Sequence, residues 1–432
     1  MAPSIRTTYA ENGILIPRIS FTCLIGLATP LSTKVPQKSN KIAFTIPLPI
    51  KPLFLYFLTE NGALTIYSKT NLYPLMDIQE RLNLIKSVGE EILMEDELLE
   101  LLKSKKQLIA YDGFEPSGKP HIAQGLIRAI NINKMTKAGV KFKMLVADWH
   151  GWANNKMGGD LDKIQVVGKY LIEVWKASGL DTKNVEFVWA SDLLNNRDYW
   201  KTVMQIARHS TLPRILRTLE IMGRTEKDTI HASQIFYPCM QAADIFHLKA
   251  DICQLGMDQR KVNVLARELA PSLGYQKPVA VHHHMLQGLL APPTTSDPIE
   301  RVAAMKMSKS RPDSAIFMTD SEEDIKRKMN KAYCLEKIAL ENPVLEYCKY
   351  IIFEKFSAFT LERPAKFGGN ITFKSYAELE KSFVDGKVHP ADLKSAVARD
   401  INKLLIPVRE YFEKNKEAKK LKELVDSYQV TR

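Results

Sequence analysis

The spacing of apolar residues changes near residue 77, and from there it predicts regular structure. Apolar positions recur at the three- and four-residue intervals of a one-sided helix in two stretches: Leu84 and Val88, then Leu98, Leu101 and Leu102. A short apolar run follows at residues 107–111 and leads into Asp-Gly, a dipeptide typical of turns. The pattern therefore predicts a pair of helices that leads into a strand.

Short apolar runs then alternate with helical patterns along the chain, at residues 143–147, 185–189, 251–255 and 279–281. The clearest helical pattern begins after Asp160, a residue type that caps helix N-termini, and comprises Ile164, Val167, Leu171 and Val174. Strands that alternate with helices favour a parallel sheet with crossover helices. We expect an α/β domain of this kind over residues 76–318.

Strand signals largely stop after residue 318, and residues 319–432 predict a second, mainly helical domain. Its first helix is marked by the capping pattern from Ser321 to Asp324. Five lysines gather near the chain end and predict either a solvated helix face or a contact with nucleic-acid phosphates: Lys414, Lys416, Lys419, Lys420 and Lys422.

Residues 1–75 differ in composition from the rest of the chain. They contain seven lysine or arginine residues, eight prolines and only two acidic residues, Glu11 and Glu60. Such a composition suits an organellar targeting peptide. It also suits an upstream extension before Met76 as the working initiator. We expect a disordered or targeting segment, and both readings stay open.

The composition of the whole chain narrows the class of protein. The 61 lysine and arginine residues outnumber the 49 acidic residues and give a formal net charge of +12, which favours a polyanionic partner. The five cysteines are widely spaced, without a C-x-x-C pair, and predict reduced thiols in an intracellular protein. The most apolar stretch, residues 42–58, contains three prolines and a lysine, so no membrane span is expected.

A turn rich in glycine, proline and serine lies between the strand ending at Tyr111 and the next predicted helix. Backbone N–H groups and a helix N-terminus meet phosphate in this arrangement. The segment alone also fits a plain strand-to-helix turn. Its candidate phosphate contacts are Gly113, Pro116, Ser117, Gly118, Lys119, His121 and Gln124.

A second candidate phosphate segment is the basic loop Lys306-Met307-Ser308-Lys309-Ser310, which follows the last predicted strand. Two flexible ammonium groups suit a loop that closes on moving phosphate charge. By itself the pentapeptide is equally compatible with a basic surface patch or a modification site.

Together the two segments resemble the HIGH and KMSKS signatures of class I aminoacyl-tRNA synthetases, the second letter for letter. The first departs from the signature, because it reads His121-Ile-Ala-Gln124 and lacks the glycine and the second histidine. The resemblance implies a Rossmann-like catalytic domain that uses ATP with Mg²⁺. It also implies catalytic roles for His121, Lys306 and Lys309, and an adenylate pocket shaped by Gly113, Gly256 and Gln259.

The amino-acid specificity is indicated by Tyr237, Gln241 and Asp244, which share one face of a predicted helix. Burying such polar groups is costly without a polar ligand, although a satisfied structural network is the alternative. With the Gly256-Met-Asp-Gln259 segment, the pattern resembles tyrosyl-tRNA synthetases of the archaeal and eukaryotic branch. The resemblance implies that tyrosine is bound by Tyr111, Tyr237, Gln241, Asp244 and Gln259, with Ala147 and His150 at the periphery.

The same resemblance implies that residues 319–432 bind the anticodon of tRNA(Tyr) and that the protein is a cytoplasmic homodimer. Phe367 suits stacking on a splayed base, and His389 and Asp392 suit reading base edges. Core packing for Phe367 and a helix start for His389 are the alternatives. The run from His282 to His284 alternates faces of an extended segment, so we expect no metal site there.

Three alternative functions remain at this stage. A tryptophanyl-tRNA synthetase would share both phosphate signatures. A non-catalytic RNA-binding relative would keep the fold but lose the exchange reaction. A nucleotidyltransferase would share the phosphate turn without needing a helical RNA-binding domain.

Overall fold

The computed structural model describes residues 76–105, 107–223, 230–295, 301 and 304–428, together with the backbone of short strands between residues 6 and 68. The chain divides into two units, Met1–Met76 and Asp77–Arg432. In the first unit, β1 (Arg6–Tyr9) pairs antiparallel with β2 (Leu15–Arg18). A second antiparallel sheet contains β3 (Ala43–Phe44), β4 (Phe54–Leu58) and β5 (Leu64–Ser68). Both readings of residues 1–75, a targeting segment and an upstream extension before Met76, stay predictions.

The second unit is built on a six-stranded sheet with the strand order β6-β11-β10-β7-β8-β9. Five strands run parallel: β7 (Ile109–Phe114), β8 (Lys141–Val146), β9 (Val185–Trp189), β10 (Ile252–Cys253) and β11 (Val279–His282). All five coincide with the predicted apolar runs, so the predicted parallel α/β sheet is confirmed. The sixth strand, β6 (Glu91–Leu93), pairs antiparallel with β11 at the sheet edge. It is missing from the prediction because three half-buried residues carry no readable period.

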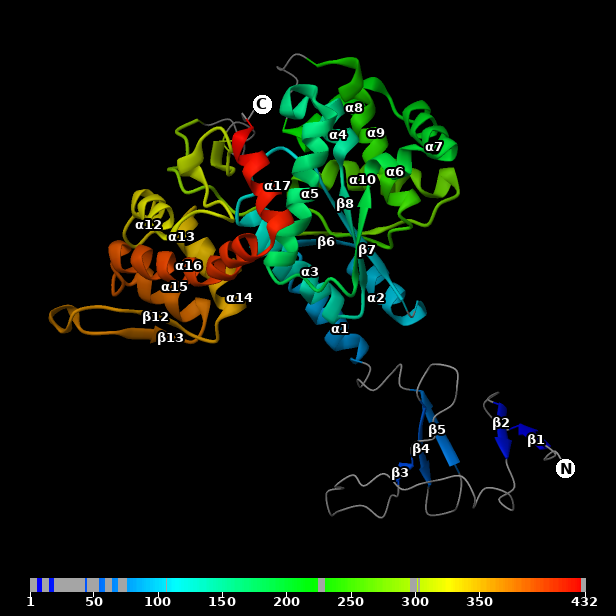
Figure 1. Ribbon diagram of the computed structural model, residues 1–432, viewed down its shortest axis with the longest axis horizontal. Coiled ribbons are helices and arrows are strands. Elements are labelled where there is room, and N and C mark those ends of the chain that lie inside the picture. The colour runs from blue at the N-terminus through cyan, green and yellow to red at the C-terminus, as the bar shows by residue number, and fades with distance from the viewer. Residues whose placement is uncertain are drawn as a thin grey trace. The chain divides into compact units, whose positions relative to one another are not determined.

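Helices surround this sheet (Figure 1). Those up to residue 269 are α1 (Ile78–Lys86), α2 (Glu95–Ser104), α3 (Arg128–Lys137), α4 (Asp148–Ala153), α5 (Leu161–Ala177), α6 (Ala190–Leu194), α7 (Arg197–Arg208), α8 (Leu212–Leu216), α9 (Ala232–His247) and α10 (Arg260–Leu269). The capping prediction for α5 is confirmed, since Asp160 Oδ1 accepts a hydrogen bond from Lys163 N at 3.0 Å.

The two faces of the sheet carry separate parts of the core, because successive strand residues point to opposite sides. Ala110 and Phe142 pack on one face in a cluster that includes α5. Tyr111 and Leu145, their alternating neighbours, pack on the other face in a cluster with α7, α9 and α10. This alternation places the Tyr111 side chain on the face that α9 covers.

The C-terminal part is mainly helical, as predicted, with α12 (Glu322–Lys331), α13 (Pro343–Tyr347), α14 (Phe353–Lys355), α15 (Tyr376–Val384), α16 (Pro390–Lys414) and α17 (Lys416–Ser427). Ser321 caps α12 by accepting from Asp324 N. A short hairpin of β12 (Phe359–Leu361) and β13 (Ile371–Phe373) is an addition to the prediction. The core cluster around α5 continues into this part through residues such as Leu405 and Phe412, and α17 lies beside α5 (Figure 1). The division between residues 318 and 319 stays a prediction.

The order of the strands fixes where a ligand can bind. From β7 the chain adds β8 and β9 on one side, and then returns to add β10 and β11 on the other side. In open parallel sheets such a reversal opens a crevice at the carboxyl ends of the two central strands, where ligands bind. Here those strands are β7 and β10.

Candidate active site

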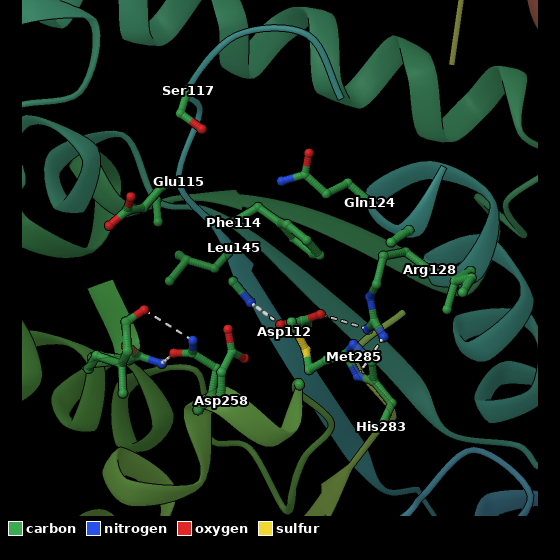
Figure 2. A pocket seen from close by; sticks show the side chains of 18 of the residues that line it. Asp112, Phe114, Glu115, Ser117, Gln124, Arg128, Leu145, Asp258, His283 and Met285 are labelled. Atoms are coloured by element: carbon green, nitrogen blue, oxygen red, sulfur yellow. Dashed lines mark hydrogen bonds and ion pairs between the residues drawn. The ribbon is translucent and has the colours of Figure 1, made fainter. Parts of the chain in front are cut away.

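A cavity of 290 Å³ opens at the carboxyl ends of β7 and β10. Figure 2 shows Glu115, Ser117 and Gln124 on one side of it and Asp258, Met285 and His283 on the other. The first group follows β7, and the second group follows β10 and β11. The cavity therefore lies at the reversal of the strand order.

The deep end of the cavity holds two of the predicted tyrosine contacts, Asp244 and Tyr111. Asp244 on α9 is fully buried and accepts a hydrogen bond from the Tyr199 hydroxyl at 2.7 Å. Its other oxygen lies 2.9 Å from His150 Nε2, and this carboxylate raises the pKa of His150 against the effect of burial. The hydroxyl of Tyr111 is also buried, but it has no hydrogen-bond partner among the described residues. An unpartnered buried hydroxyl beside a carboxylate is a place where a ligand hydroxyl would be stabilised.

The wall of the cavity nearest α9 is formed by Tyr237, Gln241 and Gln259. Gln241 Nε2 donates to Gln259 Oε1 at 3.0 Å, and Gln259 Nε2 donates to the Ile221 carbonyl at 3.1 Å. The Tyr237 ring packs edge-on against His150 with centroids 5.1 Å apart, and burial raises its pKa. All five predicted tyrosine contacts line this one cavity, with Ala147 and His150 beside them.

The first phosphate segment folds as a turn that enters a short π-helix, Ala123–Ile127, before α3 begins. Gly118 adopts a φ of +104°, which side chains rarely tolerate. Burial and the nearby Lys309 lower the pKa of His121 to about 3, so its imidazole is neutral at pH 7. His121 Nδ1 and Gln124 Oε1 are both buried without hydrogen-bond partners among the described residues, and both residues line the cavity.

The second phosphate segment closes against the first. Lys309 Nζ donates to Ser117 Oγ at 3.0 Å and to the Gly118 carbonyl at 3.3 Å. Burial, together with Lys156, lowers the pKa of Lys309 to about 7. Lys306 Nζ donates to Asp258 Oδ2 at 3.0 Å on the opposite wall. The fold therefore brings together two lysine-bearing and serine-bearing segments that the sequence keeps far apart.

Several predicted ATP contacts lie outside the cavity lining. The Lys119 side chain points to the C-terminal helix, where Nζ lies 2.8 Å from Asp426 Oδ1. Ser308 and Ser310 are at the surface and hydrogen-bond to each other at 2.9 Å. Seven of the predicted ATP contacts line the cavity: Gly113, Ser117, His121, Gln124, Gly256, Lys306 and Met307. The other six lie outside its lining: Pro116, Gly118, Lys119, Ser308, Lys309 and Ser310.

The two predicted adenylate glycines differ in what they require. A Cβ on Gly256 would meet the Met285 sulfur at 2.4 Å and Asp258 Oδ1 at 2.7 Å, so these two side chains would have to shift. A Cβ on Gly113 would meet only Leu145 at an ordinary 3.6 Å. Packing is therefore tight around Gly256 and ordinary around Gly113.

A buried ionic network in the lining of the cavity is absent from the sequence prediction. Asp112 Oδ2 lies 2.7 Å from Arg128 Nη2, and both side chains are almost fully buried (Figure 2). Arg128 also donates to Gln254 Oε1 at 2.7 Å and contacts His283 Nδ1 at 3.1 Å. Burial raises the pKa of Asp112 to about 6 although Arg128 lowers it. The available sequence signal was Arg128 itself, a charged residue within an otherwise apolar helix start.

The histidine run has three separate sets of partners. His282 contacts Glu91 and Asn263, His283 belongs to the network with Arg128, and His284 lies between Glu90 and Glu346. Among the described residues no group of three or more histidine, cysteine, aspartate or glutamate side chains could hold a metal ion.

The predicted anticodon residues lie at the surface of the C-terminal part. Phe367 is 62% exposed, which excludes the alternative of core packing. His389 is the N-cap of α16 and accepts a hydrogen bond from Ala391 N at 3.2 Å. It therefore stands at the start of a helix, which was the alternative to a role in reading bases. Asp392 lies in the first turn of the same helix.

Comparison with known proteins connects this geometry to a family. Residues 103–406 match the family model for class I tRNA synthetases of tryptophan and tyrosine. The chain is 50% identical over 359 residues to cytoplasmic tyrosine–tRNA ligase 1 of Arabidopsis thaliana, covering 82% of this chain and 90% of that protein. It is 45% identical over 378 residues to the tyrosine–tRNA ligase of Pyrococcus abyssi, covering 83% and 100%. The chain belongs to the tyrosine–tRNA ligase family.

Solved structures of this family share the fold. The tyrosyl-tRNA synthetase of Pyrococcus horikoshii complexed with L-tyrosine superposes with a TM-score of 0.76 at 44% identity, over 81% of this chain and all of that chain. The tryptophanyl-tRNA synthetase of Aeropyrum pernix has a TM-score of 0.55 at 19% identity, over 78% of this chain and 85% of that chain, which shows a common fold alone. The predicted membership in the tyrosyl branch is confirmed.

Proposed function

We propose that the chain activates L-tyrosine with ATP and transfers the tyrosyl group to the 3′ end of tRNA(Tyr). The observation that carries this proposal is the buried Tyr111 hydroxyl, which has no hydrogen-bond partner among the described residues and lines the same cavity as the buried Asp244 carboxylate. Among the canonical amino acids, tyrosine has the apolar ring and terminal hydroxyl that fit such a site. Phenylalanine has no such hydroxyl, so it would leave Tyr111 and Asp244 without a hydrogen-bond partner from the substrate.

The substrate is oriented by both ends of the cavity. Its hydroxyl meets Tyr111 and Asp244, while its amino group meets the polar wall of Tyr237, Gln241 and Gln259. Tyrosyl-tRNA synthetases are known for discrimination against phenylalanine of about 10⁵ without editing, and rejection by unpaired buried polar groups is the accepted reason. The arrangement of Gln241 and Gln259, held by the Ile221 carbonyl, supports the same mode of binding.

In the first step, a carboxylate oxygen of tyrosine attacks the α-phosphorus of ATP. The bond between that phosphorus and the bridging oxygen to the β-phosphate breaks, and pyrophosphate leaves. The carboxylate is already ionised at neutral pH, so no general base is needed. Catalysis then consists of positioning and of cations and donors directed at the phosphate charge. We assign this role to Lys306, Lys309 and His121.

The buried polar atoms of the first segment that lack partners among the described residues support this assignment. The neutral His121 has an unpartnered Nδ1, so its ring can donate one N–H to a phosphate oxygen. The unpartnered atom of Gln124 is Oε1, an acceptor, so a phosphate contact through Gln124 would use its amide N–H instead. Pro116, Gly118, Lys119, Ser308 and Ser310 belong to the same proposed ATP site. Lys119 would have to leave Asp426 in order to reach a phosphate.

Mg²⁺ is proposed to enter with ATP as part of the substrate. The four carboxylates that line the cavity each have a partner: Asp112 has Arg128, Glu115 has Asn154, Asp244 has Tyr199, and Asp258 has Lys306. Among the residues that the structure describes, these contacts leave no free set of carboxylates at the cavity for a resident ion.

In the second step, a terminal ribose hydroxyl of the tRNA attacks the carbonyl carbon of tyrosyl-adenylate and AMP leaves. We propose that residues 319–432 hold the anticodon, with Phe367 stacking on a base and His389 and Asp392 reading base edges. The exposure of Phe367 supports this role, because an exposed aromatic ring is available for stacking.

We also propose that the protein works as a cytoplasmic homodimer. Large apolar side chains are exposed on α4, α7, α8 and α9, which suits an interface: Trp152, Trp200, Met204, Leu212 and Phe236. The name of the Arabidopsis relative as cytoplasmic supports the compartment. None of the described helices is long and apolar enough to cross a membrane. Light scattering of wild type and Met204→Asp tests the dimer.

The experiment that tests the function is ATP–pyrophosphate exchange with each amino acid in turn. Exchange stimulated by tyrosine is the expected result, and Asp244→Ala is expected to relax the preference for tyrosine over phenylalanine. Exchange stimulated by tryptophan would contradict the assignment. RNA binding without any exchange would instead support a non-catalytic relative.

A further inference from the structure

The segment of residues 284–289, which follows β11, is held by an acidic residue of the C-terminal part. Gln287 N donates a hydrogen bond to Glu346 Oε2 at 2.9 Å, and the Glu346 side chain is only 16% exposed. Glu346 belongs to α13, whose N-cap Asn342 accepts from Val344 N and Leu345 N. Because Val344, Leu345 and Tyr347 are fully buried, α13 is a firm support for this carboxylate.

The same segment sets the position of the Lys306 loop. Gln287 and Lys306 form an antiparallel bridge, and Gly288 N donates to the Met305 carbonyl at 2.7 Å. Leu289 N donates to the Ser314 carbonyl at 2.9 Å, beyond the other end of the loop. A Cβ at Gly288 would meet three backbone carbonyl oxygens at 3.1–3.2 Å, so the strands are closely apposed. A shift of Gln287 would therefore move Lys306.

His284 adds a second contact between Glu346 and the cavity. Its Nε2 lies 3.2 Å from Glu346 Oε2, its Nδ1 lies 3.2 Å from Glu90, and its ring stacks on Tyr350 with centroids 4.3 Å apart. His284 also lines the cavity. One carboxylate of the C-terminal part thus contacts a cavity-lining side chain and the backbone that carries the Lys306 loop.

We propose that Glu346 is a positioning residue that fixes the Lys306 loop for the adenylation step. Its bond to Gln287 holds the 284–289 segment, and this segment holds Lys306 opposite the phosphate turn. The inference rests on the proposed function, in which Lys306 stabilises the charge that develops on the phosphates. It also links the C-terminal part to the phosphate-binding loop through the 284–289 segment.

Steady-state pyrophosphate exchange with three variants of Glu346 tests this role. Glu346→Ala is expected to lower kcat by about tenfold, as for loss of one charge-assisted hydrogen bond, with KM for tyrosine unchanged. Glu346→Gln keeps an oxygen that accepts from Gln287 N, so its kcat is expected to stay within about threefold of wild type. In Glu346→Asp the side chain keeps its charge but is too short to reach Gln287 N, so its kcat is expected to be about as low as that of Glu346→Ala.

The matched control is Glu354→Ala. Glu354 is also an acidic residue of the C-terminal part that reaches the sheet domain, where it pairs with Lys134 on α3 at 2.8 Å, away from residues 284–289. Its kcat is expected to equal that of wild type. Amide hydrogen exchange gives an independent measurement, with faster exchange at residues 285–289 and 304–309 expected in Glu346→Ala and Glu346→Asp only.

The outcomes separate this inference from the proposed function. Wild-type protein without tyrosine-dependent exchange would refute the proposed function, while hydrogen exchange would still test the Glu346 contact. Active wild type with unchanged kcat and unchanged hydrogen exchange in Glu346→Ala would overturn the positioning role. A kcat equally low in Glu346→Gln and Glu346→Ala would overturn it as well.

Discussion

Lys309 Nζ lies 3.0 Å from Ser117 Oγ, and this contact joins two segments that are 192 residues apart in the sequence. The lysine is therefore already at the turn that would hold the phosphates of ATP. The Lys309 side chain is partly buried, and a cation in such a site acts more strongly on developing charge than one in water.

Lys309→Ala is expected to lower kcat for pyrophosphate exchange by roughly 10²–10³, the usual effect of removing one donor to a transition-state charge. KM for tyrosine should change little, because Lys309 contacts Ser117 and Gly118 of the phosphate turn and does not line the cavity that holds the predicted tyrosine contacts. Lys414→Ala is the control, since Lys414 is a surface residue paired with Glu410. Equal activity of the Lys309 variant and wild type would remove Lys309 from the mechanism.

The rate is expected to depend on pH through Lys309. Burial, with Lys156 nearby, lowers the pKa of Lys309 to about 7, so the free enzyme loses this charge as pH rises through about 7. Since kcat/KM reports ionisations of the free enzyme, kcat/KM for ATP should fall above that pH. Arginine stays protonated, so Lys309→Arg should be less active but should lack this fall. A fall that persists in Lys309→Arg would assign it to another group.

Tyr111→Phe is expected to separate specificity from stability. The Tyr111 hydroxyl is buried without a hydrogen-bond partner among the described residues, so its removal should not lower the melting temperature. The variant should nevertheless lose roughly tenfold or more of the preference for tyrosine over phenylalanine, because a ligand hydroxyl loses one partner. Exchange kinetics with both amino acids measure this preference. An unchanged ratio would place the ligand hydroxyl elsewhere.

The buried ion pair of Asp112 and Arg128 should be important for stability. Arg128→Met leaves a buried carboxylate without its cation, and such a loss costs about 3–5 kcal/mol of unfolding free energy. Adding Asp112→Asn removes the stranded charge, so the double variant should recover part of that loss. Urea denaturation measures both values. A double variant less stable than Arg128→Met would contradict this account of the pair.

Phe367→Ala should affect tRNA and not the adenylate. The ring is exposed, so the substitution should leave stability and pyrophosphate exchange unchanged. KM for tRNA in aminoacylation should rise by roughly tenfold, since stacking of a base on an aromatic ring contributes about 1–3 kcal/mol. Leu340→Ala, at an exposed apolar residue of the same C-terminal part, is the control. Identical KM values for both variants would argue against base stacking at Phe367.

The sequence alone was sufficient to predict features that depend on near neighbours. Helix α5 and its Asp160 cap follow from side-chain spacing within a few turns, and the common face of Tyr237, Gln241 and Asp244 follows from helical geometry. The five parallel strands could be predicted because strands buried on both faces are continuous apolar runs. The two phosphate segments could be recognised because their residue types are consecutive.

The tertiary structure decided which distant groups meet. No local pattern indicates that Arg128 pairs with Asp112 and His283, or that Glu346 reaches the backbone at Gln287. The antiparallel strand β6 exists through its pairing with β11, and Lys119 is directed to Asp426 by the packing of α17 beside α5. Such contacts depend on the packing of whole elements, whereas periodicity and capping depend only on residues within a turn or two.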